Sequence, residues 1–92
     1  MNYTVIFDEF FIDDVERHRQ AERHDLVSKI GVLVSELENH PRIGTGKPER
    51  LKHLQGDVWS RRIDSRHRLI YEIRNQELIV IAVSAYGHYG DK

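Results

Sequence analysis

The spacing of apolar residues changes twice within the first forty positions of the chain. Residues 2–7 (NYTVIF) alternate loosely and are rich in aromatic and β-branched side chains, which predicts a first strand. Residues 8–23 carry apolar side chains three or four positions apart among acids and arginines, which predicts an amphipathic helix. A second helix is expected next, because its main apolar positions form a stripe at spacings of four, three and four: Leu26, Ile30, Leu33 and Leu37.

The boundaries of this second helix can also be predicted from individual residues. Asp25 is placed to cap its start, because an aspartate side chain accepts hydrogen bonds from the free N–H groups of a first helical turn. Pro41 is expected to end it, since proline lacks the N–H and disfavours helical geometry in the residue before it. Gly31 costs about 1 kcal/mol relative to alanine, so we expect it to permit close packing on a sheet.

The pattern of the second half predicts a loop followed by strands. Residues 44–48 form a basic, glycine-containing loop, and Leu51 and Leu54 are expected to anchor a short irregular or strand segment. An antiparallel meander follows, with strands at residues 58–63, 68–73 and 77–85. Its apolar face must be covered, and the two helices are available for this. The predicted class is therefore α+β, with an N-terminal strand and two helices packed on a mainly antiparallel sheet of four to five strands.

Length and composition narrow the class of protein. Ninety-two residues suit one domain, and an apolar fraction of 39% is low but globular. The chain has no cysteine, which excludes disulfides and thiolate metal sites, and its histidines lack HExxH spacing. Nothing resembles a signal peptide, and the longest apolar run, residues 78–83, is too short to cross a bilayer. We therefore expect one cytoplasmic domain over residues 1–92, with no metal, cofactor or membrane segment.

Charge is divided unevenly along the chain, although the formal net charge is only −1. Residues 1–40 carry four Lys/Arg against nine Asp/Glu, a balance of −5, whereas residues 41–74 carry nine against four, a balance of +5. A basic middle region on an acidic scaffold favours a local anionic ligand over general coating of nucleic acid. The alternative is that helices and strands simply share charge unevenly, without any ligand.

Residues in the basic region and near the C-terminus suit acid–base chemistry on a phosphate. Glu49 lies among cations that keep a carboxylate ionised, so it can accept a proton from a hydroxyl; the alternative is a surface ion pair. His88 can act as general acid if the last strand brings it beside Glu49 and Arg68; the alternative is a solvated tail residue.

Arginines and tyrosines around these positions are open to two interpretations. Planar guanidinium groups suit a phosphate whose charge grows in a transition state, but they also suit cross-strand ion pairs. The arginines concerned are Arg61, Arg62, Arg66 and Arg68. Tyr86 and Tyr89 can stack on a base or pack on the sheet edge.

Several separated blocks occur in order, at suitable spacing, between residues 44 and 89. They are GKPE-x-LKH, W-S-R-R-I and HR-L-x-Y, followed by a His-Tyr pair near the end. In these blocks the chain resembles the Txe/YoeB family of bacterial toxins within the RelE-like superfamily, and its N-terminal half is similar in its plan of one strand and two helices. It departs from the family at Gly87, where relatives can have a tyrosine, and in residues 90–92, which extend beyond the His-Tyr pair.

The resemblance implies a type II toxin with a RelE-like fold that cleaves mRNA in the ribosomal A site by metal-free transesterification. Carried over onto this chain, it assigns the general base to Glu49, the general acid to His88 and phosphate stabilisation to Arg68. Tyr89 corresponds to the terminal tyrosine that helps to position the substrate. The expected substrate-binding cations are Lys47, Lys52, Arg61 and Arg62.

The same resemblance implies the partners of the protein. They are a cognate antitoxin of the YefM/Phd-like kind, the ribosome with its mRNA, and a second copy of the chain in a homodimer. The antitoxin is expected to be an acidic or amphipathic segment that neutralises the basic region. Two other functions stay open: a non-catalytic toxin that binds a protein target, as ParE-like toxins bind DNA gyrase, and an inert antitoxin-binding module.

Overall fold

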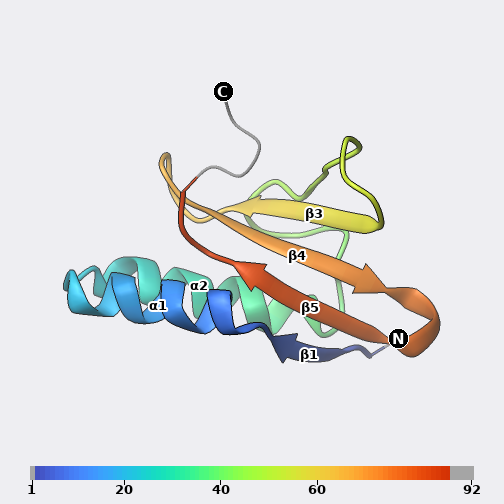
Figure 1. The fold of residues 1–92 in the computed structure, drawn as a ribbon, viewed down its shortest axis with the longest axis horizontal. Coiled ribbons are helices and arrows are strands. Elements are labelled where there is room, and N and C mark those ends of the chain that lie inside the picture. The colour runs from blue at the N-terminus through green and yellow to red at the C-terminus, as the bar shows by residue number, and fades with distance from the viewer. Residues whose placement is uncertain (1, 88–92) are drawn as a thin grey trace.

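A five-stranded mixed sheet and two helices make up residues 2–87, which are the residues that the computed structural model describes (Figure 1). The strands are β1 (Thr4–Phe7), β2 (Glu49–Arg50), β3 (Asp57–Arg62), β4 (Arg68–Arg74) and β5 (Ile79–Ser84). The other elements are α1 (Glu9–Gln20), α2 (His24–Leu37) and a 3₁₀ turn at Asn75–Glu77. The strand order is β1-β5-β4-β3-β2, in which only β1 and β5 are parallel. The predicted class and order of elements are confirmed.

Helix α1 begins where the spacing of apolar residues changes. The Asp8 carboxylate accepts a hydrogen bond of 2.9 Å from the Phe10 N–H, which satisfies one free donor of the first turn. Phe11 and His18 are the buried residues of this helix, and their separation of seven positions keeps them on one face. None of the helices in the described part of the chain is long and apolar enough to span a membrane.

Helix α2 buries the predicted stripe of Leu26, Ile30, Leu33 and Leu37, but two predictions about it are wrong. Asp25 does not cap the helix, because the helix starts at His24, two residues earlier than predicted; Arg23 holds the N-cap position, and the Asp25 carboxylate pairs with its guanidinium. Gly31 faces open space, so it permits no close packing on the sheet. The helix ends at Leu37, before Pro41 is reached.

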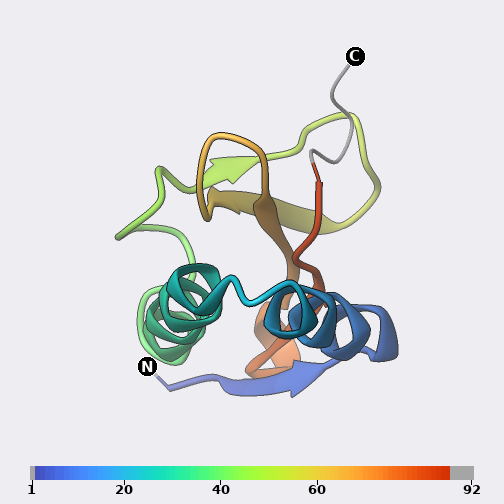
Figure 2. The ribbon, with the colours of Figure 1, turned by 90° about the vertical axis from the view of Figure 1, so that its left-hand side faces the viewer.

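One apolar core lies between the helices and alternate residues of the sheet. Opposing residues of β4 and β5 share a face, because Tyr71 pairs with Ala82 and Ile73 with Val80. Phe11 of α1 and the four buried residues of α2 join the same cluster. Figure 2 shows α1 (blue) and α2 (teal) lying next to each other, with β3 and β4 above them. The core therefore fixes the helices against the strands that carry the basic region.

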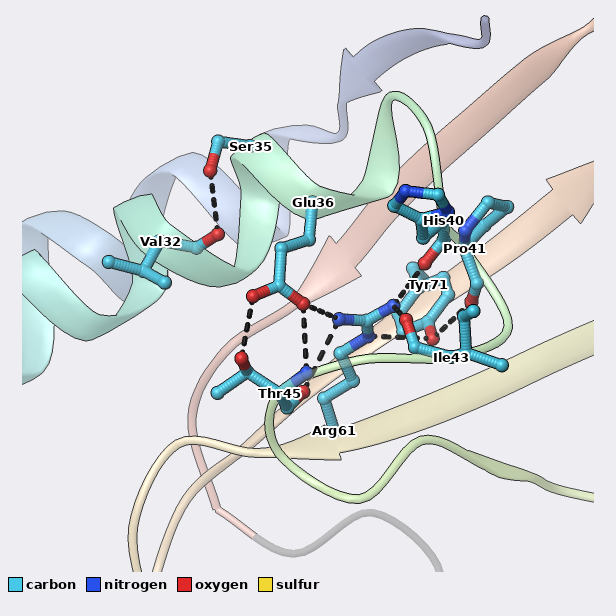
Figure 3. A network of polar contacts seen from close by, with 9 residues as sticks. All are labelled: Val32, Ser35, Glu36, His40, Pro41, Ile43, Thr45, Arg61 and Tyr71. Carbon is cyan, nitrogen blue, oxygen red and sulfur yellow. Dashed lines mark hydrogen bonds and ion pairs between the residues drawn. The ribbon is translucent and has the colours of Figure 1, made fainter. Parts of the chain in front are cut away.

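The guanidinium of Arg61 is fully buried against the loop that follows α2 (Figure 3). Its Nε donates to the Tyr71 hydroxyl at 3.1 Å, and its Nη1 donates to the Glu36 carboxylate at 2.7 Å. The remaining donors reach three backbone carbonyls at 2.5–3.3 Å: those of His40, Ile43 and Thr45. All five N–H donors therefore have an acceptor, which offsets the cost of burying the charge.

Glu36 and Gly44 complete this network. The Glu36 carboxylate accepts from the hydroxyl and the amide of Thr45 at 2.6 and 2.8 Å, and these bonds, followed by Arg61, hold the pKa of Glu36 below its ordinary value. Gly44 has a φ of 124°, and a Cβ at this position would collide with the Glu36 carboxylate, so the position requires glycine. The loop is thereby held against β3, and β2 follows directly with Glu49 at its start.

This network corrects the prediction that Arg61 binds substrate. Successive residues of a strand point to opposite faces, and Arg61 points into the core, with 0% exposure, whereas Arg62 is exposed. Arg61 is therefore out of reach of a substrate, and its observed contacts are all with the protein itself.

We expect Arg61→Met to lower the free energy of unfolding by about 3–5 kcal/mol, the usual cost of removing one partner from a buried ion pair. The substitution leaves Glu36 and three loop carbonyls without their donor. Urea denaturation followed by circular dichroism measures the change. Arg62→Met, at the next and exposed position, is the matched control and should stay within about 0.5 kcal/mol of wild type. A loss in Arg61→Met no larger than the control's would show that the network adds little stability.

Candidate functional site

Glu49 and Arg68 lie on two strands that are separated in the sheet by β3. Glu49 opens β2 and pairs with Ser60, while Arg68 opens β4 and pairs with Arg62. Their side chains meet across β3, with Glu49 Oε1 3.9 Å from Arg68 Nη1. The Glu49 side chain is 70% exposed and that of Arg68 is 26% exposed. The structure thus brings the predicted base and the predicted phosphate-stabilising arginine together at the surface.

A hollow of about 550 Å³ lies at this carboxylate and is lined by residues 49–53. Lys52 lines it, and Lys47 lies in the exposed loop just before it. Arg62 is exposed directly opposite Arg68 in the β3–β4 register. Within residues 2–87, the side chains of Lys47, Lys52 and Arg62 form no ion pair. Two like charges placed opposite each other repel, so a bound anion would stabilise this arrangement.

Gly87, the last described residue, lies beside Arg68 at the start of β4. The Arg68 N–H donates to the Gly87 carbonyl at 3.0 Å, and the Gly87 N–H donates to His67 Nδ1 at 2.9 Å. The residue that precedes His88 in the chain is therefore bound to the start of β4. His88 and Tyr89, the predicted acid and the predicted substrate-positioning tyrosine, lie outside the described residues.

Sequence reasoning missed that two side chains of α1 bind the segment after β5. Asp14 Oδ2 accepts the Ala85 N–H, and Nε2 of the buried His18 donates to the Ala85 carbonyl, both at 2.8 Å. The available signal was that these residues are four apart and share a helix face, with the histidine on the apolar stripe. Tyr86, whose residue type allows either stacking on a base or packing on the sheet edge, packs on the imidazoles of His18 and His67.

The environment of His67 favours a neutral imidazole. Burial, followed by the neighbouring His18, lowers the pKa of His67 below its ordinary value, and Asp64 opposes this only in part. A neutral ring is also what the geometry requires, because Nδ1 must carry a lone pair to accept the Gly87 N–H.

Comparison with known proteins finds related toxins. The family model of YoeB-like toxins of bacterial type II toxin–antitoxin systems matches residues 7–89. Toxin YoeB of Escherichia coli K12 is 36% identical over 78 residues, which cover 85% of this chain and 92% of that protein. A YoeB/ParE toxin from Agrobacterium tumefaciens has a similar structure, with a TM-score of 0.79 at 29% identity over 94% of this chain and 99% of that one.

YoeB from Staphylococcus aureus is similar in two solved structures, at 31% identity over 97% of this chain and 100% of that one. One of them is a YoeB dimer, with a TM-score of 0.79. The other is a YoeB–YefM complex, with a TM-score of 0.75.

We expect the free energy of unfolding to decrease as the pH falls below about 6.5, in part through His67. Its pKa is lowered in the folded state, so the unfolded chain binds the proton more readily. The stability that neutral His67 contributes is therefore present above the unfolded pKa and is lost as the pH falls toward the folded pKa. Chemical denaturation from about pH 5 to 7.5 measures this.

His67→Asn should show a shallower decline with falling pH, because asparagine accepts a hydrogen bond without titrating. His24→Asn, at an exposed histidine that begins α2, should decline as wild type does. Equal slopes for wild type and His67→Asn would contradict the expectation.

Proposed function

The chain belongs to the YoeB-like toxins of bacterial type II toxin–antitoxin systems, and we propose that it is an endoribonuclease that cuts mRNA in the ribosomal A site. The observation that carries this proposal is the Glu49 carboxylate 3.9 Å from the Arg68 guanidinium, at an open hollow in the basic region. A base and a cation this close together can act on two adjoining groups of one nucleotide, its 2′-hydroxyl and the neighbouring phosphate.

The proposed reaction is a transesterification within the RNA strand. Glu49 removes the proton of a 2′-hydroxyl, and that oxygen attacks the adjacent phosphorus. His88 donates a proton to the departing 5′-oxygen, and Tyr89 helps to position the substrate. The products are a 2′,3′-cyclic phosphate on one fragment and a 5′-hydroxyl on the other.

Arg68 is available to the substrate because its contact with Glu49 is weak. An exposed ion pair contributes about 0–1 kcal/mol, and Glu49 is 70% exposed. A phosphate can therefore replace the carboxylate as the partner of Arg68 at little cost, which leaves Glu49 free to act as a base. The guanidinium then stabilises the negative charge that develops on the phosphate oxygens in the transition state.

The exposed cations around this pair are suited to the neighbouring phosphates of the RNA. Lys47, Lys52 and Arg62 form no ion pair within the described residues, so their charge is available to an anionic ligand. Such a concentration of positive charge attracts RNA over a distance and holds it by its backbone. These residues supply binding, whereas Glu49 and Arg68 supply the chemistry.

We also propose a cognate antitoxin and a second copy of the chain as partners. The similar S. aureus YoeB has been solved as a dimer and as a YoeB–YefM complex. An acidic or amphipathic antitoxin segment that covers Lys52 and Arg62 would neutralise their charge and exclude RNA from the hollow.

Glu49→Gln should lower the rate of mRNA cleavage roughly 100- to 10,000-fold, because an amide cannot accept the hydroxyl proton. Arg68→Met should lower it about 100- to 1,000-fold through loss of charge stabilisation. Primer extension on mRNA in a translating extract measures cleavage. Glu77→Gln, at an exposed carboxylate between β4 and β5, is the matched control and should cleave as wild type does.

An extract in which the wild type leaves mRNA intact would reject the endoribonuclease. Undiminished cleavage by Glu49→Gln would reject the assignment of the base. Growth arrest that survives Glu49→Gln while DNA supercoiling decreases would instead support a non-catalytic, ParE-like toxin.

A further inference from the structure

Residues 85–87, which follow β5, are held by the protein at both ends. Two side chains of α1 bind both backbone groups of Ala85, each at 2.8 Å. At Gly87, His67 Nδ1 binds the N–H and the Arg68 amide binds the carbonyl. Backbone groups of a connecting segment at the surface are commonly left to water, so four protein partners indicate a segment with a defined position.

Ring contacts around Tyr86 hold the His67 imidazole in its orientation. The Tyr86 ring lies 4.6 Å from the His67 ring and stacks on His18 at 4.9 Å. The two imidazoles meet edge to face at 4.6 Å, and the Arg17 guanidinium lies 3.6 Å from the centre of the tyrosine ring. His67 is therefore half-buried, with its ring packed between His18 of α1 and Tyr86.

The direction of each hydrogen bond determines where the imidazole protons lie. Gly87 N–H is a donor, so His67 must accept through an unprotonated Nδ1 and carry its proton on Nε2. The Ala85 carbonyl is an acceptor, so His18 must donate through a protonated Nε2. A proton added to His67 would go to Nδ1 and would face the Gly87 N–H, which ends that contact.

Building on the proposed endoribonuclease function, we propose that His67 is a positioning residue. Its neutral imidazole binds Gly87, the residue covalently joined to His88, and keeps that point of the chain beside Arg68. The Arg68 side chain also contacts Glu49. The bond between His67 and Gly87 therefore holds the residue before His88, the proposed acid, close to the proposed base and the proposed phosphate-stabilising cation. Fixing the residue next to a reacting group reduces the conformational freedom that the group must lose when the substrate binds.

Several charged and titratable groups face His67 and set its response to acid. They are His18 of α1, Arg23 between the helices, Asp64 and Arg66 of the β3–β4 turn, and Tyr86. Burial and the cationic groups favour the neutral ring, and Asp64 favours the protonated one. Loss of the Gly87 contact on acidification is therefore expected to displace Gly87 from Arg68 and slow cleavage.

The test uses the full-length toxin in three variants: His67→Leu, His67→Asn and, as a matched control at an exposed histidine, His24→Leu. Single-turnover cleavage on saturating mRNA-programmed ribosomes should fall roughly 10- to 100-fold in His67→Leu, the scale for misplacing a group by about 1 Å. Affinity for the ribosome should not change. His67→Asn keeps an acceptor near Nδ1, so it should recover most of the rate and show a shallower decline in cleavage with acid than wild type. His24→Leu should match wild type.

An NMR measurement tests the contact without reference to cleavage. A ¹⁵N–¹⁵N scalar coupling across the hydrogen bond should join the Gly87 amide to His67 Nδ1 at neutral pH and disappear as His67 is protonated. Absence of the coupling at neutral pH, or wild-type cleavage by folded His67→Leu, overturns the proposal. If His67→Leu does not fold, a decline in cleavage by His67→Asn as steep as that of wild type, between about pH 7 and 5, overturns it. A wild type that shows the coupling but cleaves no mRNA overturns the endoribonuclease function and leaves the contact standing.

Discussion

Burial of a single positive charge constrains much of this molecule. The Arg61 guanidinium carries five donors into a position with 0% exposure, and each of them needs an acceptor. Carbonyls inside helices and sheets are already used in their own ladders, so the loop after α2 supplies three of the acceptors. That loop must fold back against β3, with glycine at position 44, and β2 then starts beside β3 with Glu49 on it. A structural arginine thus determines where the proposed catalytic carboxylate lies.

Neighbouring arginines have opposite roles because a strand alternates its faces. Arg61 points into the core and is neutralised there, whereas Arg62 points to solvent opposite Arg68. The positive charges of Arg62 and Arg68 repel each other, so this surface attracts an anion. The proposed substrate-binding surface therefore consists of three cations that form no ion pair within residues 2–87: Lys47, Lys52 and Arg62.

Parallel pairing of β1 with β5 explains how the acidic N-terminal half contributes to this site. Phe7 at the end of β1 lies opposite Ala82 of β5, so α1 starts close to where β5 ends. Asp14 and His18, which lie between one and three turns along α1, then reach Ala85, more than sixty positions away in the sequence. Asp14, one of the acids of the N-terminal half, therefore binds the segment after β5 and does more than balance the charge of the basic region.

The sequence by itself determined the elements and the candidate pair Glu49 and Arg68. The spacing of apolar residues indicates which face of a helix or strand is buried, and the motif blocks identify residue types at fixed offsets. Both are local properties of the chain. Only the tertiary structure decided that Arg61 is buried and that His67 binds Gly87. Each of these outcomes depends on which distant backbone or side chain meets a polar group. Because a polar side chain acts in a site or in the core according to its partners, its role follows from packing and not from its position in the sequence.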